Sequence, residues 1–363
     1  MIRMSKIGII TFHFVNNYGG VLQAYALQKV ISDLGHKVYV IDYRNWFIRF
    51  TDAVRMMPVT KRLDVFKAGM KSYGDRKGRV AKINRFIQGN LNLTKRVTYH
   101  ELYTLDADFD KFICGSDQIW NPLITGGVDK AYYLDFINDK SKKISYAPSM
   151  GTGRLFGFHL KKMFRMIEEI GYLSIREKST EEMLFKELGK RSEIMVDPTF
   201  LMNLDEWEML VDKPDGLPEK YILLYMMQGD ERIYEYARRM KEVFNVPIVE
   251  ISRYGYNPGF ADYIKVNVGI EEFLGLFLNA TYICTNSYHG FVYSLIFKKD
   301  LCLIPSVHFS ARIRNLLELF EMSDADLSTK EKLLMEIDYN KADSIIRKQR
   351  NKALDYLSRA INE

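Results

Sequence analysis

The chain has 363 residues, a length that favours two domains, each large enough to bury its own core. Hydrophobic residues make up 47% of the sequence and charged residues 27%. This excludes intrinsic disorder, and the absence of any run of about 18 uncharged apolar residues excludes a membrane-spanning helix. The net charge of +6 is not accompanied by a nucleic-acid docking motif, so we expect no nucleic-acid partner.

The first half of the chain alternates short apolar strands with helices. Residues 7–14 lack the small-residue cleavage site of a secretory signal, so we read them as a first strand. A glycine-containing turn, a helix that ends at Gly35 and a strand at residues 37–42 follow, which is the βαβ unit of a parallel sheet. Further strands are expected at residues 109–114, 143–148, 173–176 and 193–196, with a helix at 179–189.

The second half repeats this alternation after a linker at residues 215–218. Strands are expected at residues 221–226, 247–251, 282–285 and 301–304, helices at 231–244, 270–279 and 291–297, and a polar helical tail from residue 328. We therefore predict an α/β fold of two Rossmann-like, doubly wound domains that face each other across a cleft. The expected domains are residues 1–205 and 218–330, with a helical tail at 331–363 that packs back on the first domain.

In such sheets the chemistry gathers where strands end and helices begin, so the strand-end loops are the candidate sites. After the first strand, Asn17, Tyr18, Gly19 and Gly20 open a helix, and two glycines there can bring backbone amides close to an oxyanion. The alternative is a simple turn between strand and helix, because neither a dinucleotide motif nor a P-loop lysine is present.

Two further loops of the first half carry polar residues. In the loop after residue 114, Asp117 either caps a helix or acts as a base toward a sugar hydroxyl, and Trp120 either lines a sugar site or belongs to the core. Arg176 precedes a helix and can grip a carboxylate or phosphate, unless Glu177 neutralises it or Lys178 in an ordinary surface pair.

In the second half, the loop of Asn286, Ser287 and His289 follows an apolar strand and opens a helix. A histidine there is either structural or a proton donor to a bound anion. Arg312 and Arg314 are two residues apart on an expected helix, so only one of them can face a site.

The cysteines and the uneven charge distribution indicate the expected cellular location of the protein. Cys114, Cys284 and Cys302 lie far apart, which indicates neither disulfides nor a metal site, so we expect a cytoplasmic protein without an obligatory metal. Residues 55–96 contain twelve Lys and Arg against two acids. This segment is either a solvated helical surface or a patch that contacts an anionic membrane or a lipid-linked phosphate at the inner membrane face.

Taken together, the loops resemble the polysaccharide pyruvyl transferase family. The matching pieces occur in family order between residue 7 and about residue 317. They are residues 7–11, NYGGVLQAYAL at 17–27, CGSDQIWN at 114–121, SYAPS at 145–149, SIREKS at 174–179, VDPT at 196–199 and TNSYHG at 285–290.

The resemblance implies a fold like that of the GT-B glycosyltransferases and transfer of a pyruvyl group from phosphoenolpyruvate to a sugar, usually as a cyclic ketal, in cell-surface polysaccharide or capsule synthesis. Arg176 matches the family's donor-site arginine and His289 its histidine before glycine. Some members have an arginine two residues before that histidine, where this chain has Ser287, so a second guanidinium must come from elsewhere and Arg312 is our candidate.

These assignments give a full set of expected site residues, with no cofactor besides phosphoenolpyruvate as co-substrate. Expected catalytic residues are His289, Arg176 and Asp117. Expected donor-binding residues are Arg176, Lys178, Asn286, Ser287, His289 and Arg312. Expected acceptor-binding residues are Asn17, Tyr18, Gly19, Gly20, Gln23, Ser116, Asp117, Gln118 and Trp120.

Two alternative functions stay open. A glycosyltransferase of the same fold would use a nucleotide-sugar, for which Glu271 and Glu272 are the nearest ribose-binding candidates. A non-catalytic, sugar-binding subunit of an envelope-assembly complex would also fit, because Ser287 stands where some family members have an arginine.

Overall fold

The computed structural model describes residues 4–58, 60–151, 157–227, 230–257, 259–305, 311–322, 328–329 and 331–363. The chain forms two compact units, each built from separate stretches of sequence. Unit 1 comprises Met1–Asp52, Ile87–Met202 and Ile346–Glu363, and unit 2 comprises Ala53–Phe86 and Asn203–Ile345. From the sequence, residues 53–86 were expected in the first domain, whereas the structure places them in unit 2. The end of the tail, Ile346–Glu363, belongs to unit 1.

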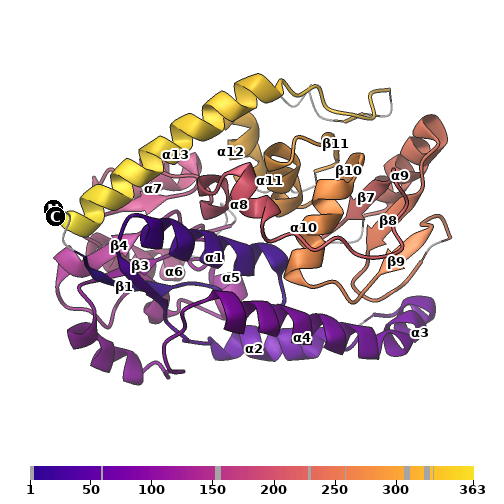
Figure 1. The fold of residues 1–363 in the computed structure, drawn as a ribbon. Helices are drawn as coiled ribbons and strands as arrows, with labels where there is room; N and C mark the ends of the chain where they lie inside the picture. The colour runs from indigo at the N-terminus through magenta and orange to yellow at the C-terminus, as the bar shows by residue number, and fades with distance from the viewer. Residues whose placement is uncertain are drawn as a thin grey trace. The chain divides into compact units, whose positions relative to one another are not determined.

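Unit 1 contains a parallel sheet in the order β2-β1-β3-β4, of which Figure 1 labels β1, β3 and β4. Its strands are β1 (Lys6–Ile10), β2 (Lys37–Val40), β3 (Lys111–Cys114) and β4 (Lys143–Ser145). Two short parallel strands, β5 (Ser174–Ile175) and β6 (Glu193–Ile194), continue beyond β4, to which the bridge between Ile144 and Tyr172 connects them. The strands are shorter than expected, because the residues that follow them form the hydrogen-bonded loops of the candidate site.

The main helix of unit 1 is α1 (Tyr18–Asp33), which packs against β2 and η4 (Pro198–Leu201). It begins at Asn17, whose side chain accepts hydrogen bonds from the first turn, and Gly35 follows it with a φ of 90°, a conformation that favours glycine. The remaining helices are α5 (Pro122–Thr125), α6 (Gly157–Glu168), α7 (Lys178–Leu188), η1 (Glu101–Asp108), η2 (Lys130–Tyr133) and η3 (Lys140–Lys142).

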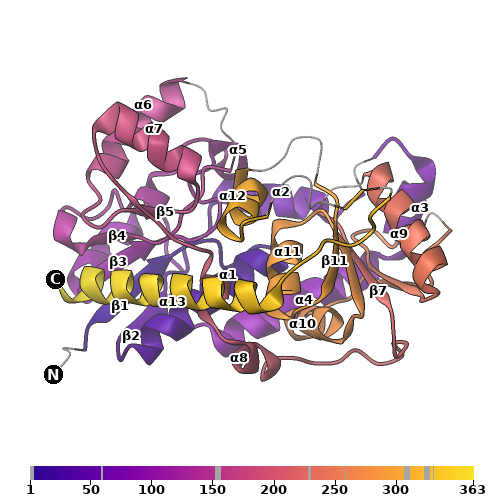
Figure 2. The same ribbon diagram turned by 90° about the horizontal axis from the view of Figure 1, so that it is seen from above.

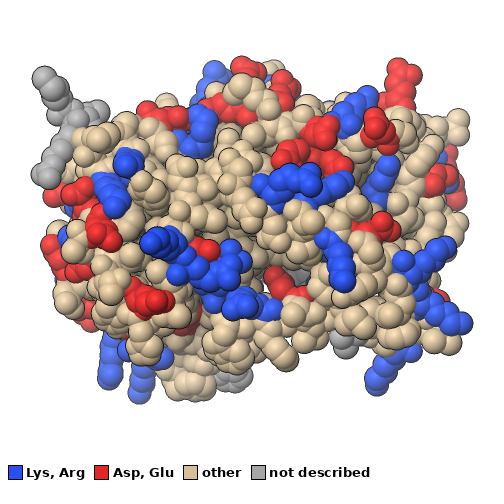
Figure 3. Space-filling view, turned by 60° about the horizontal axis from the view of Figure 1, so that its bottom comes forward, with Lys and Arg blue, Asp and Glu red and all other residues tan. Residues whose placement is uncertain are grey.

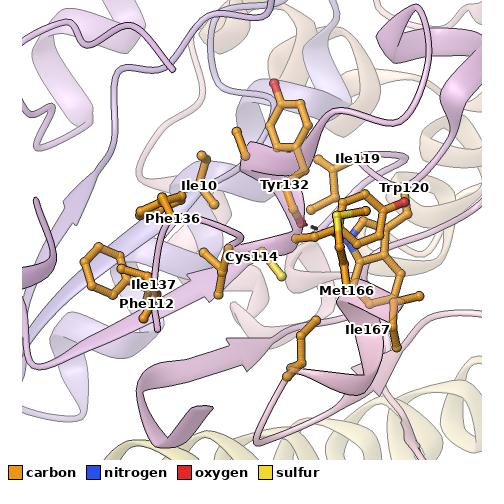
Figure 4. Packing of buried hydrophobic residues seen from close by; sticks show 14 of the residues in the cluster. Ile10, Phe112, Cys114, Ile119, Trp120, Tyr132, Phe136, Ile137, Met166 and Ile167 are labelled. Carbon is orange, nitrogen blue, oxygen red and sulfur yellow. Dashed lines mark hydrogen bonds between the residues drawn. The ribbon is translucent and has the colours of Figure 1, made fainter. Parts of the chain in front are cut away.

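The core of unit 1 is rich in aromatic side chains. Figure 4 shows part of it, where Trp120 and Tyr132 lie beside Cys114 of β3 and Met166 of α6. The Trp120 ring stacks on Tyr133 with 5.2 Å between ring centroids, and its Nε1 donates to the Tyr132 carbonyl at 2.9 Å. This packing holds the loop after β3 rigidly.

The C-terminal helix α13 (Tyr339–Asn362) ends in unit 1. The Tyr356 hydroxyl donates to the Ser145 carbonyl at the end of β4 at 2.8 Å, and Lys352 Nζ donates to the Ile194 carbonyl at 2.9 Å. Figure 2 shows α13 running past the strands of this sheet. These contacts explain why the end of the tail belongs to unit 1.

Unit 2 contains a second parallel sheet, in the order β11-β10-β7-β8-β9. Its strands are β7 (Ile222–Tyr225), β8 (Ile248–Ile251), β9 (Tyr263–Lys265), β10 (Tyr282–Thr285) and β11 (Asp300–Leu303). Helices α8 (Leu204–Glu208), α9 (Glu231–Phe244), α10 (Ile270–Asn279), α11 (Tyr288–Ile296) and α12 (Ala311–Leu319) accompany them. The sequence did not predict β9, which is three residues long and partly exposed.

The basic segment forms helices, which are α2 (Trp46–Arg55), α3 (Leu63–Lys71) and α4 (Tyr73–Asn90). Not all of its cations are solvated, because Arg76 and Arg79 are buried and Lys82 pairs with Glu272 at 2.6 Å. Within the described residues, no helix combines the length and the apolar character needed to cross a membrane.

The tail prediction was wrong between residues 328 and 338. Helix α13 begins only at Tyr339, whereas the Met335 amide donates to the Leu301 carbonyl of β11 at 2.8 Å. Leu333 and Met335 are buried there, so this part of the tail is held by packing in unit 2.

Candidate active site

The start of α1 was expected to offer free amides to an anion, and the structure gives these amides another partner. Asn17 Oδ1 accepts hydrogen bonds from the amides of Gly19 at 3.0 Å and Gly20 at 3.4 Å. A Cβ atom on Gly20 would lie 2.6 Å from a methyl group of Val15 and 3.4 Å from Asp117 Oδ2. Gly20 is therefore required by close packing, and Tyr18 beside it is buried.

The loop after β3 interlocks with the loop after β4. The Ser116 hydroxyl donates to the Ala147 carbonyl at 2.7 Å, and the Ser149 amide donates to the Asp117 carbonyl at 2.8 Å. Asp117 has a φ of 63°, a left-handed conformation that is uncommon for an aspartate and is often found at functional sites. Its carboxylate is directed to the first turn of α1.

Arg176 lies in the same region of unit 1, just after β5. Its Nη2 contacts the Ser116 hydroxyl and forms an ion pair with Asp197 Oδ2 at 2.8 Å. The sequence suggested Glu177 as a neutralising partner, but Glu177 is buried and bonded to the Ser149 hydroxyl, so the carboxylate that balances Arg176 is Asp197. Arg176 thus links the Ser116 loop to the start of η4, and Lys178 is exposed at the start of α7.

Two expected acceptor-binding residues prove to be structural. Trp120 is 1% exposed and belongs to the core, so it cannot form the wall of a sugar site. Gln23 is fully buried and connects two loops to α1, because its Nε2 donates to Thr11 Oγ1 at 2.9 Å and its Oε1 accepts from the Ser116 amide at 3.1 Å. Gln118, in contrast, is partly exposed beside Gly151.

A buried network at the ends of β1 and β2 was not expected from the sequence. His13 Nε2 lies 3.1 Å from Asp42 Oδ1, and Arg44 Nε donates to the same oxygen at 2.6 Å. Although burial acts to raise it, hydrogen bonds with His13 and Arg44 hold the pKa of Asp42 well below its usual range. His13 is fully buried, so this network connects the segments that follow β1 and β2.

In unit 2, the loop after β10 is built to start a helix. Ser287 caps α11 by accepting a hydrogen bond from the Gly290 amide at 3.3 Å, and Asn286 Oδ1 accepts from the Met227 amide at 3.0 Å. A Cβ on Gly290 would lie only 2.3 Å from Thr285 Oγ1, so glycine lets α11 pack tightly on the end of β10.

His289 lies in the first turn of α11 and is largely buried. The rings of His289 and Tyr288 are perpendicular, with 5.1 Å between their centroids. The Arg312 guanidinium lies over the Tyr288 ring at 5.0 Å, while Arg314 is exposed. The structure therefore brings a cation close to the start of α11, where the helix dipole also favours an anion.

The expected site residues thus form two groups. In unit 1, Ser116 connects Asp117 and the start of α1 with Arg176; in unit 2, Asn286, Ser287 and His289 lie with Arg312 around the start of α11. Sequence reasoning missed two further polar residues of unit 2, Arg79 on α4 and Tyr225 at the end of β7. Arg79 belongs to no motif, and nothing in the spacing of the sequence connects it with β7.

A model of the family described as polysaccharide pyruvyl transferase matches residues 17–304 of the chain. This range contains every expected site residue except Arg312. No curated protein matches the chain.

Two solved structures share the fold at low sequence identity. One is a protein from Listeria monocytogenes described as a UDP-N-acetylglucosamine 2-epimerase, 10% identical, with a TM-score of 0.50 over 99% of this chain and 92% of that chain. The other is MnaA from S. aureus, solved with UDP, 12% identical, with a TM-score of 0.51 and the same coverage of both chains. Together with the two parallel sheets, they confirm the expected GT-B-like α/β fold.

Proposed function

Since the chain belongs to the polysaccharide pyruvyl transferase family, we propose that it moves a pyruvyl group from phosphoenolpyruvate to two hydroxyls of a sugar. The product is a cyclic ketal on a cell-surface polysaccharide, such as a capsule, or on its precursor. Residues of unit 2 bind the donor, and residues of unit 1 bind the acceptor.

The observation that carries this proposal is the start of α11. Phosphoenolpyruvate has a carboxylate and a phosphate on one enol carbon, so its site needs cations and amide donors. The first turn of α11 supplies the positive end of a helix dipole, His289 supplies a titratable ring, and Arg312 supplies a guanidinium over the neighbouring Tyr288.

The chemistry follows from the donor. His289 in its protonated form gives a proton to the methylene carbon, and the enol carbon becomes electrophilic. A sugar hydroxyl adds to this carbon and loses its proton, for which Asp117 is the base in our proposal. The bond from this carbon to the phosphate oxygen then breaks, inorganic phosphate leaves, and the second hydroxyl adds with loss of its own proton. The transfer as written needs neither a metal nor a further cofactor.

In unit 1, we propose a positioning role for Arg176. Its charge is balanced by Asp197, and it contacts Ser116, the residue before Asp117. We propose that Arg176 fixes the Ser116 loop, so that Asp117, Gln118 and the start of α1 at Asn17 orient the acceptor.

The test compares donors directly. Calorimetric titrations with phosphoenolpyruvate, UDP-N-acetylglucosamine and UDP-glucose measure binding, and phosphate release in the presence of methyl glycosides with free vicinal hydroxyls measures turnover. We expect binding of phosphoenolpyruvate and of neither nucleotide-sugar. Binding of a nucleotide-sugar alone would favour the glycosyltransferase, and binding of glycosides alone would favour the non-catalytic subunit.

One observation favours a nucleotide-sugar enzyme as second candidate, and one opposes it. The similar MnaA structure was solved with UDP. However, Glu272, half of the acidic pair suggested for ribose, already accepts hydrogen bonds from the Gly269 amide and from Lys82 Nζ, each at 2.6 Å. The Glu272 carboxylate is therefore already used to cap α10 and to pair with Lys82. For this reason we favour a pyruvyl transferase over a nucleotide-sugar enzyme.

We also propose that α2 and α3 contact an anionic membrane surface. Helix α2 exposes Trp46 by 70%, Phe50 by 58% and Val54 by 41%, spaced four residues apart on one face. Helix α3 exposes Leu63 and Phe66 together with Met70 in the same manner.

Exposed cations accompany these apolar faces, which is the pattern of interfacial helices on anionic lipid. They are Arg49, Arg55, Lys61, Lys67 and Lys71. The face that Figure 3 brings forward carries Lys and Arg in several groups, with Asp and Glu and uncharged side chains between them. An acceptor carried on a lipid phosphate at the cytoplasmic side of the membrane would explain such a surface.

Vesicle flotation tests this surface. Vesicles of phosphatidylcholine with phosphatidylglycerol should bind the protein better than phosphatidylcholine alone. W46A/F50A should lose binding because apolar contact area is removed, and K67E/K71E should lose at least about 1 kcal/mol per basic residue removed. M209A removes an equally exposed apolar side chain outside α2 and α3 and serves as control. Equal binding to both vesicle types at low and moderate salt would refute the proposal.

A further inference from the structure

Arg79, on α4, is a buried arginine whose charge no described residue balances. It is 8% exposed, its Nε has no hydrogen-bond partner, and its guanidinium forms no ion pair with any residue that the structure describes. A buried cation without a partner destabilises a folded protein, so a position that keeps one points to a ligand.

The neighbouring cations of α4 show that this helix can provide its cationic side chains with hydrogen-bond partners. One turn earlier, Arg76 donates from Nη1 to Ser72 Oγ and from Nη2 to the Met56 carbonyl, both at 2.8 Å. One turn later, Lys82 donates to Glu272 at 2.6 Å. All three residues belong to unit 2, but Arg79 has no such hydrogen bond to a residue that the structure describes.

The packing of α4 places Arg79 at the carboxyl edge of the second sheet. The Ser72 hydroxyl donates to the Tyr254 carbonyl, after β8, at 2.8 Å. A Cβ on Gly78 would lie 2.6 Å from the Asn267 side chain, after β9, so α4 touches the loops that follow both strands. Because β7 is next to β8 in this sheet, the end of β7 lies along the same edge.

The electrostatics of Tyr225, the last residue of β7, agree with this placement. Burial raises the pKa of Tyr225 to about 12, while a hydrogen bond with Ser287 and the positive charge of Arg79 both act to lower it. Ser287 is the residue that caps α11. Tyr225 is thus close enough to both Arg79 and the residue that caps α11 to interact with each of them.

We propose that, given the function proposed above, Arg79 binds an anionic group of the donor, its carboxylate or its phosphate, together with the start of α11. It would add a guanidinium to that of Arg312 in a site where Ser287 stands at the position at which some family members have an arginine. Its planar guanidinium can bind either a carboxylate or a phosphate through two parallel hydrogen bonds.

The experiment measures binding of phosphoenolpyruvate, inorganic phosphate, pyruvate and UDP to the full-length protein by calorimetry. In R79M, affinity for phosphoenolpyruvate should fall about 10- to 150-fold, as expected for the loss of a charged hydrogen-bonding group, and R79K should be intermediate. Loss of affinity for phosphate or for pyruvate identifies the group that Arg79 holds. R238M, which removes an exposed arginine from α9, should bind like the wild type.

Stability in urea without ligand gives a second readout. R79M should be as stable as the wild type or more stable, because the substitution removes an unbalanced buried charge. Lower stability of R79M together with unchanged affinity for phosphoenolpyruvate would overturn the proposal.

The two proposals fail in different ways. If the wild type binds UDP but not phosphoenolpyruvate, the proposed function is wrong, yet a loss of UDP affinity in R79M would still support Arg79 as an anion-binding residue. If the wild type binds phosphoenolpyruvate and R79M binds it equally well, only the role of Arg79 is wrong.

Discussion

The Nη2 atom of Arg176 lies 2.8 Å from Oδ2 of Asp197, and both side chains are almost completely buried. Removing one partner of a buried pair leaves the other charge uncompensated. We therefore expect D197N to lower the free energy of unfolding by about 3–5 kcal/mol in urea denaturation. E193Q, which breaks the exposed pair of Glu193 and Arg359, should cost at most about 1 kcal/mol.

A substitution of Arg176 distinguishes a positioning role of this residue from direct binding of the donor. R176M should lose stability and turnover together, with its KM for phosphoenolpyruvate little changed. A stable R176M with a strongly raised KM for phosphoenolpyruvate would instead make Arg176 a donor ligand.

Trp120 should matter for stability and not for acceptor binding. W120A should lower the free energy of unfolding by about 3–5 kcal/mol, because a large buried ring is removed from the core. W46A, at an exposed tryptophan, should change it by less than about 0.5 kcal/mol. A stable W120A with a raised acceptor KM would contradict the assignment of Trp120 to the core.

Glu250 on β8 makes stability depend on pH. Burial raises its pKa to about 7, and a hydrogen bond with Ser252 opposes this rise. Between the ordinary pKa of a glutamate and pH 7, the folded protein holds a proton that the unfolded chain has lost. The contribution of Glu250 to the free energy of unfolding is thus present at low pH and falls, by up to about 3 kcal/mol, as the pH rises through 7.

E250Q keeps the shape of the side chain and cannot titrate. Urea denaturation at pH 5 and pH 8 should show a smaller loss of stability for E250Q than for the wild type. Equal pH dependence in both proteins would mean that Glu250 is ionised in the fold at both pH values.

His289 should be needed for turnover but not for folding. H289A should reduce phosphate release about 10²- to 10⁴-fold at saturating phosphoenolpyruvate, the usual contribution of general acid–base catalysis. Circular dichroism and urea denaturation control for its folding. Near-normal turnover of a folded H289A would remove His289 from the mechanism.

Sequence reasoning worked where local signals and packing agree. The bounds of α9 and α10 match the prediction, since α9 is capped by Asp230 and ends at Asn245 with a φ of 51°. The strands were recognised from their apolar runs, because strands buried on both faces of a parallel sheet are apolar throughout.

The sequence could not predict features that depend on contacts between residues far apart in the chain. No local pattern states that Trp120 stacks on Tyr133, that Asp197 balances Arg176, or that Arg79 lies near Tyr225, because each relationship is fixed by the packing of separate segments. The loops of the candidate site were chosen from the sequence, whereas the burial and the hydrogen-bond partners of their side chains could not be predicted from it.

The three-part composition of unit 1 has a consequence for how the protein is made. The Tyr356 hydroxyl donates to the Ser145 carbonyl of β4, and Ile346–Glu363 completes this unit. β4 can therefore form these contacts only after α13 has been translated. A ribosome that pauses within α13 would therefore leave the nascent first sheet without the contacts of this helix, a stage at which incompletely packed chains are prone to aggregate.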